Sequence, residues 1–132
     1  MKKHGIVLVV GIMLLVLSVM VAGCAKQEGG EDKLEAAITA VAKQKTPENY
    51  LNLSLRYYEA RQFEKSIEAS QEALKLKPDF APAYNNICAA YNEQKMWDKA
   101  IEACEQALKI DPGFQLAKGN LNWALSAKAA KK

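Results

Sequence analysis

The feature that most constrains this chain is a unit that is written twice without a gap, first as residues 47–80 and again as residues 81–114. Thirteen of the 34 aligned pairs are identical, against the roughly two expected from average composition. Each unit holds two stretches with apolar residues three and four apart, joined by a short turn, which is the spacing of amphipathic helices. One such helix pair cannot bury its apolar stripe alone, so the repetition predicts pairs that stack on one another.

The recurring residues resemble the pattern of the tetratricopeptide repeat. In residues 47–80 the pattern falls on Tyr50, Ser54, Tyr57, Ser66, Ser70, Ala73 and Pro78. In residues 81–114 it falls on Tyr84, Cys88, Tyr91, Ala100, Cys104, Ala107 and Pro112. The resemblance implies an all-α fold, a short α-solenoid of two helix-turn-helix repeats. Arg61 and Lys95 stand where the family often has Gly, and a non-Gly residue in a left-handed turn costs roughly 1 kcal/mol.

Helical patterns flank the repeats on both sides. Residues 31–46 carry Leu34, Ala37, Ile38 and Val41 at helical spacing. This helix is either the degenerate second helix of an earlier repeat or a cap on the first repeat. The weak match in the repeat register favours an N-terminal capping helix. Residues 115–132 start like a third unit and stop after one helix, with polar Lys118, Asn122 and Lys128 where a following helix would lie. We therefore expect a C-terminal capping helix, which keeps such arrays soluble.

Residues 1–23 read as a signal peptide, with Lys2-Lys3-His4 before an apolar run from Gly5 to Ala22. Residues 21–24, Val-Ala-Gly-Cys, resemble the lipobox of bacterial lipoproteins. That resemblance implies cleavage before Cys24 and a lipid on its sulfur. An uncleaved transmembrane anchor is the alternative, because the apolar run is at the lower limit of length for spanning a bilayer. Both alternatives tether the folded part outside the cytoplasmic membrane, with the lysines inside.

Residues 24–30 are predicted to be a flexible linker between the anchor and the fold. The residue after Cys24 is Ala25 rather than Asp. In the lipoprotein family this favours the outer membrane, on its periplasmic side, if the cell is Gram-negative. The expected location is therefore the bacterial cell envelope.

Charge and composition argue against several other functions. Removing residues 1–23 leaves 16 basic and 15 acidic residues, a balance too even for a nucleic-acid surface. His4 is the only histidine, so the mature chain would have no imidazole base and no histidine-based metal site. Its carboxylates follow helical spacing beside lysines, as solvated faces do. We expect no enzyme, no catalytic residues, no metal and no cofactor.

Cys88 and Cys104 are the only cysteines in the repeats, one on each helix of the second pair. The first repeat has Ser54 and Ser70 at the same places, so both positions favour small side chains that meet across the pair. Export permits a disulfide, but two buried thiols without a bond fit the same pattern.

The remaining candidate site is the inner, concave face formed by the first helix of each pair. Helical spacing and the resemblance place there a ladder of amides, one at the same place in each successive unit, namely Asn52, Asn86 and Asn120. Amides donate and accept together, which suits an extended peptide backbone. Bonds from these amides to neighbouring helices, which would merely orient the stack, explain the ladder equally well.

Leu55, Tyr58 and Trp123 complete the predicted partner-binding set on this face. Trp123 is either an interface anchor or part of the terminal cap. Some family members bind a carboxylate there with basic residues, but the equivalent places here are Leu51, Leu55, Asn86, Leu116 and Asn120. A hydrophobic or mildly basic peptide therefore fits this face better than a carboxylate does.

The sequence thus predicts a membrane-anchored adaptor that binds a protein or peptide partner at the cell envelope. The alternative role is a structural, self-associating scaffold component, an assembly factor similar to the pilotin lipoproteins. Two repeats bury little core, which favours stacking of copies into a homo-oligomer.

Overall fold

The computed structural model describes residues 28–131, and these form six helices and no strand. The helices are α2 (Glu28–Lys43), α3 (Pro47–Glu59), α4 (Phe63–Leu76), α5 (Ala81–Glu93), α6 (Trp97–Ile110) and α7 (Gln115–Ala129). The predicted all-α fold is confirmed for this part of the chain. The predicted signal peptide and Cys24 lie outside the described residues.

Two predicted boundaries at the N-terminal side need correction. Helix α2 begins at Glu28 and ends at Lys43, whereas the sequence placed a linker up to residue 30 and a helix over 31–46. Glu28, Gly29 and Gly30 are therefore helical rather than linker. The chain divides into two compact units, Met1–Asp32 and Lys33–Lys132, and the second contains both repeats. Between residues 28 and 131, none of the helices has the length and apolarity needed to cross a membrane.

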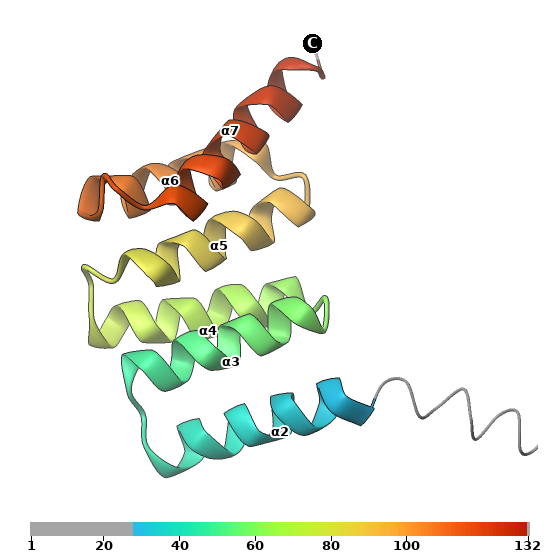
Figure 1. Cartoon of the computed structure of the whole chain (residues 1–132), viewed down its shortest axis with the longest axis vertical. Helices are drawn as coiled ribbons and strands as arrows, with labels where there is room; N and C mark the ends of the chain where they lie inside the picture. Colours follow the sequence, from blue (N-terminus) through green and yellow to red (C-terminus); the bar gives the residue numbers. More distant parts are fainter. Residues whose placement is uncertain (1–27, 132) are drawn as a thin grey trace, which may run out of the picture. The chain divides into compact units, whose positions relative to one another are not determined.

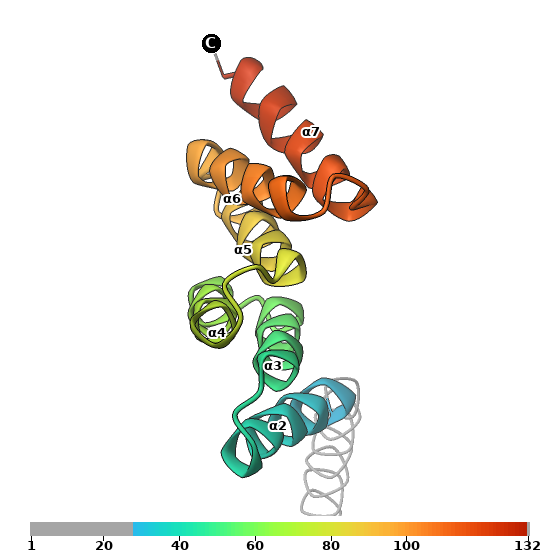
Figure 2. The same cartoon turned by 90° about the vertical axis from the view of Figure 1, so that its left-hand side faces the viewer.

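The repeats stack in chain order within the second unit. Helix α3 packs against α4, and α5 packs against α6, as antiparallel pairs (Figures 1 and 2). Helix α4 then contacts α5, and α6 contacts α7. The first helices also touch one another, α3 with α5 and α5 with α7. Consequently α3, α5 and α7 form one continuous layer, which we call the first-helix layer.

Local chemistry explains where the repeat helices begin and turn. Thr46 Oγ1 accepts the Asn49 backbone N–H at 3.1 Å and caps α3, while Pro47 occupies the first turn, where no N–H is needed. The turns inside the pairs place Arg61 and Lys95 at φ 58°. These are the two positions at which the sequence predicted left-handed backbone without Gly, and that prediction is confirmed.

The interior of the first pair is held by hydroxyl groups. Ser54, Ser66 and Ser70 are all fully buried. Ser54 Oγ lies 3.1 Å from Ser66 Oγ and 2.6 Å from Ser70 Oγ. Because each hydroxyl can donate and accept, three small polar side chains satisfy one another where the two helices approach closely.

The second pair fills the same positions with Cys88, Ala100 and Cys104, also fully buried. Around them lies the larger apolar cluster, which reaches Ile67 on α4 and Ala124 on α7. The second repeat is therefore packed from both sides. The first repeat shares a smaller cluster with α2, through Ala37, Leu53 and Ala69.

Candidate functional site

The exposed side of the first-helix layer carries most of the residues that the sequence selected. Asn52, Leu55 and Tyr58 come from α3, Asn86 comes from α5, and Asn120 and Trp123 come from α7. Because α3, α5 and α7 are in contact in that order, residues at the same place in successive repeats fall on neighbouring helices. We call this side the first-helix face.

The amide ladder is engaged in bonds within the protein. Asn86 Nδ2 donates to Ser54 Oγ at 3.3 Å, and Asn120 Nδ2 donates to Asn85 Oδ1 at 2.9 Å. The buried Asn92 donates to the backbone carbonyl of Asn120 at 2.9 Å. These bonds connect α3 to α5 and α5 to α7. Of the two roles considered for the ladder, peptide binding and orientation of the helix stack, they correspond to the second. Recognition of a partner by the ladder remains a prediction.

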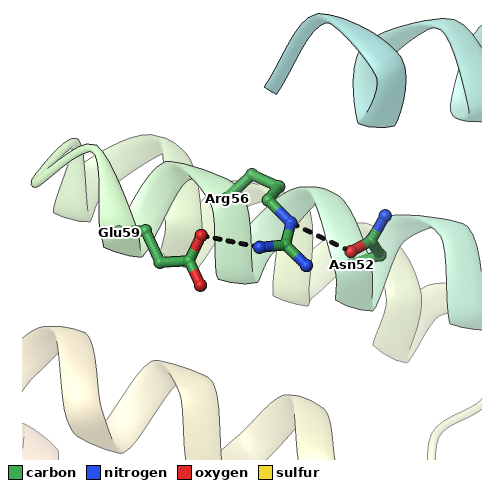
Figure 3. Close-up of polar contacts among 3 residues, drawn as sticks. All are labelled: Asn52, Arg56 and Glu59. Atoms are coloured by element: carbon green, nitrogen blue, oxygen red, sulfur yellow. Dashed lines mark hydrogen bonds and ion pairs between the residues drawn. The ribbon is translucent and has the colours of Figure 1, made fainter. Parts of the chain in front are cut away.

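The third member of the ladder, Asn52, is held by an arginine that the sequence analysis did not select. Arg56 Nε donates to Asn52 Oδ1 at 3.3 Å, and Arg56 Nη1 donates to Glu59 Oε2 at 2.7 Å. Figure 3 shows the three side chains in a row along α3. The corresponding places on α5 and α7 are Ala90 and Ala124, which are fully buried. That contrast in the aligned repeats was the available signal.

Tyr58 lies half-buried at the end of α3, near the following repeat. Its hydroxyl donates to Glu93 Oε1 at 3.3 Å, and its ring meets Phe63 edge-on with centroids 5.6 Å apart. Burial, together with the charge of Glu93 and the bond to it, raises the pKa of the Tyr58 hydroxyl above its ordinary value. Tyr58 therefore helps to join the two repeats.

The apolar members of the predicted set stay uncovered. Leu55 is 40% exposed, Trp123 is 45% exposed, and Leu116, also on α7, is 67% exposed. Trp123 also meets Trp97 edge-on, with ring centroids 6.3 Å apart. One edge of Trp123 therefore contacts Trp97 while nearly half of the side chain stays exposed, and its role as interface anchor remains a prediction. Aromatic side chains are enriched among the anchors of protein interfaces.

The two cysteines of the second repeat are joined in the structure. Cys88 Sγ and Cys104 Sγ are 2.08 Å apart, with the Cα atoms at 5.3 Å, within the range that a disulfide requires. Of the two alternatives from the sequence, the structure has the bonded one, and a thiol assay tests it in solution. Over residues 28–131, no group of three or more His, Cys, Asp or Glu side chains is arranged to hold a metal ion.

Comparison with known proteins identifies the repeats. Models of the tetratricopeptide repeat match residues 47–80 and 81–114, which together make up just over half of the chain. These are the boundaries that the internal repetition predicts. No curated protein matches the chain.

Several solved structures share this arrangement of helices. A crystal structure of MamA superposes with a TM-score of 0.69 at 29% identity, covering 76% of this chain and 55% of the MamA chain. The chain therefore spans about half the length of that relative. The first repeat domain of human RPAP3 gives a TM-score of 0.74 at 20% identity, covering 89% and 93%. The first repeat domain of Spaghetti (RPAP3), bound to the HSP90 peptide SRMEEVD, gives 0.72 at 20% identity, covering 87% and 92%.

Proposed function

The chain belongs to the tetratricopeptide repeat family, and we propose that it is an adaptor that binds a partner protein or peptide at the bacterial cell envelope. The fold is a scaffold of helix pairs, which presents side chains on a fixed frame. The proposed work of the chain is binding rather than catalysis. Peptide binding by similar domains supports this, since one solved neighbour holds an HSP90 peptide and another an HSP70 peptide.

The observation that carries the proposal is the uncovered apolar surface on the first-helix face. Leu55 on α3 and Trp123 on α7 occupy equivalent positions of the repeat pattern, and both are at least 40% exposed. Ala89 stands between them at the same position and is half-buried. A partner segment that lies across α3, α5 and α7 would cover Leu55 and Trp123 together. An aromatic anchor of this kind can contribute about 2 kcal/mol or more to binding.

The envelope location rests on the sequence around Cys24. The apolar run before it ends in Val-Ala-Gly-Cys, and we propose that the Cys24 sulfur carries the lipid anchor, with the folded part exposed to the periplasm. Cys24→Ser should then abolish incorporation of labelled fatty acid and leave the precursor uncleaved. If wild-type protein takes up no labelled lipid, the lipid-anchor proposal fails and the uncleaved transmembrane anchor takes its place.

A site-specific cross-linking experiment tests the adaptor role. A photoreactive residue is placed at Trp123 or at Leu55 in the full chain, and cells are irradiated intact. Both positions should give the same discrete adduct. The control position is Glu102, which is exposed on α6, outside the first-helix layer. Adducts of equal yield at Glu102, or none at Trp123 and Leu55, would refute partner binding on this face.

Self-association is the second candidate, and one residue of α7 favours it. Leu125 is 47% exposed and stands at the place of Tyr57 and Tyr91, beside which Lys65 and Lys99 of the paired second helices lie. Helix α7 has no such second helix among the described residues. If two copies of the chain bury the Leu125 surface against each other, the mass in solution should rise with concentration, and Leu125→Gln should reduce that rise.

A further inference from the structure

A basic pocket lies away from the amide ladder, where the turn between α5 and α6 meets the end of α7. Its volume is about 440 Å³, and its apolar lining comes from Met96 and Trp97. Four lysines and one acid complete the wall: Lys95, Lys99, Lys128, Lys131 and Asp98. The lysines outnumber the acid by three, which is unusual in a chain whose acids and bases nearly balance after residue 23.

Only one of these lysines is neutralised. Lys128 Nζ is paired with Asp98 Oδ1. Within the part of the chain that the structure describes, Lys95, Lys99 and Lys131 form no ion pair with a carboxylate. Lys99 Nζ lies 5.5 Å from the centre of the Tyr91 ring, which leaves its charge without an acidic partner. Like charges on one pocket wall attract an anion.

The first repeat shows how the fold normally balances this place. Arg61 in the turn after α3 is paired with Glu93 near the end of α5, at 3.7 Å. Beside it, Gln94 Nε2 donates to Glu64 Oε1 at 2.5 Å. The positive charge of the turn is thus met by an acid from the next first helix.

One repeat later the same contacts recur without that acid. Lys95 replaces Arg61, and Lys128 with Asp98 replaces Gln94 with Glu64. The residue one repeat after Glu93 is Ala127. The second repeat therefore has Ala127 in place of the acid that pairs with Arg61 in the first, and Lys128 in place of the neutral Gln94. The pocket is a charged site that the protein itself leaves incomplete.

The surroundings of the pocket also favour an anion next to an apolar group. Helix α6 starts at Trp97 with no side-chain cap on its first N–H groups, so its positive end adds to the charge of the lysines. Trp97 lies in edge contact with Trp123, which joins the pocket to the exposed apolar surface of the first-helix face. A ligand with a carboxylate beside an aliphatic side chain would meet both features.

We propose that this pocket binds an acidic peptide segment, with one carboxylate among Lys95, Lys99 and Lys131 and an apolar neighbour against Trp97. It is distinct from the positions at which some family members clamp a carboxylate, since those are Leu51, Leu55, Asn86, Leu116 and Asn120 here. A peptide fits better than a lipid headgroup, because a peptide can place an apolar side chain directly beside a carboxylate and so meet Trp97 and the lysines together.

The test uses the full chain in a neutral detergent and three probes. The first is a fluorescein-labelled peptide, acetyl-Gly-Glu-Leu-Glu-Glu-Gly-amide, read by anisotropy. The second is the same peptide with Gln in place of every Glu. The third is glycerol phosphate, a headgroup probe that competes for the site. The acidic peptide should bind at least tenfold more tightly than the Gln peptide, and binding should weaken as salt rises.

Two variants of the pocket and one matched control locate the binding. Lys95→Gln with Lys131→Gln should weaken the acidic peptide at least fivefold. Lys109→Gln with Lys118→Gln makes the same change in net charge on exposed residues outside the pocket and should leave affinity within twofold. Ala127→Glu restores the counter-ion of the first repeat, so it should weaken the peptide at least fivefold with no loss of thermal stability.

Three results would overturn the proposal. Equal losses in the pocket variant and in the Lys109 and Lys118 control would show attraction to net charge alone. Undiminished binding by Ala127→Glu would show that the peptide lies elsewhere. Displacement of the labelled peptide by glycerol phosphate at lower concentrations than the unlabelled acidic peptide requires would assign the pocket to phosphate headgroups instead. Normal cross-linking at Trp123 in the pocket variants would separate each of these failures from failure of the adaptor role.

Discussion

The two repeats share one backbone frame but are held together by different interior chemistry. Where the helices of the first pair approach, the Ser54 hydroxyl contacts the hydroxyls of Ser66 and Ser70. The second pair has Cys88 and Cys104 in a disulfide at the same two positions as Ser54 and Ser70. Both solutions satisfy a demand for small side chains. The hydroxyl contacts constrain only the native state, whereas the disulfide also constrains the unfolded chain.

The difference follows the position of each repeat in the stack. The second repeat contacts α4 on one side and α7 on the other. It supplies six buried members of the larger cluster, namely Ile87, Cys88, Ala90, Ala100, Ala103 and Cys104. The first repeat meets only the smaller cluster on its α2 side. A cross-link in the second repeat therefore fixes the part of the molecule on which both neighbours pack. The predictions below test that contrast.

Removing the disulfide should have the largest effect. The two cysteines are separated by 16 positions in the sequence, and closing a loop of that size stabilises a fold by about 3 kcal/mol through the unfolded chain. Cys88→Ser with Cys104→Ser should lower the free energy of unfolding by about that amount, measured in urea. Wild-type protein under reductant should match the double variant, and the double variant should ignore reductant. If oxidised wild-type protein shows two reactive thiols after denaturation, the bond is absent in solution.

Moving the disulfide into the first repeat should have the next largest effect, in the opposite direction. Ser54 and Ser70 have the same separation in the sequence, and their hydroxyl oxygens lie 2.6 Å from one another. Ser54→Cys with Ser70→Cys should add about 3 kcal/mol. The lost hydroxyl contacts with Ser66 and Asn86 should offset about 1 kcal/mol of this. The two single variants are the controls, and a double variant no more stable than either would show that the repeats are not interchangeable here.

The turns within the pairs predict a smaller difference. Arg61 and Lys95 both have φ 58°, where Gly relieves about 1 kcal/mol of strain. Lys95→Gly should stabilise the fold by about that amount. Arg61→Gly should be nearly neutral, since it also removes the pairing with Glu93 and the contact with the Phe63 ring. Urea midpoints of the two variants give the comparison, and an equal gain in both would show that the Arg61 contacts contribute nothing.

The sequence predicted the repeats and their turns because they depend on local patterns that occur twice. The repetition located both helix pairs, and the substitution of Arg61 and Lys95 for Gly identified the strained backbone. The start of α2 was placed too late in the chain. Gly29 and Gly30 indicated a linker, yet they are helical in the structure, so the spacing of Leu34, Ala37 and Val41 outweighed their weak propensity.

The site was predicted less completely, because its chemistry depends on contacts between repeats. The amides of the ladder were selected, but their bonds to Ser54 and Asn85 follow from the stacking of helices. Arg56 was overlooked although its partners in the alignment are alanines. The basic pocket was also overlooked, because its lysines come from two segments that are distant in the sequence. The absence of an acid at position 127 has meaning only once Glu93 is seen beside Arg61.

The smallest predicted effect concerns pH and again contrasts the repeats. Tyr58 belongs to the first repeat, and the aligned residue of the second repeat is Asn92. Burial and then Glu93 raise the pKa of its hydroxyl, so the neutral phenol is favoured more in the folded protein than in the unfolded chain. Its contribution to stability is therefore complete below the ordinary tyrosine pKa and is lost as pH rises through the higher folded value.

The side chain of Tyr58→Phe cannot ionise, so the melting temperature of this variant should fall less with rising pH than that of wild-type protein in the alkaline range. Near neutral pH the two proteins should show the same slope of melting temperature against pH. Glu93→Gln should give an intermediate slope, because it removes the charge but not the burial. Parallel alkaline slopes for all three proteins would show that Tyr58 is no better shielded than it is in the unfolded chain, and that the contact joining α3 to the end of α5 opens in solution.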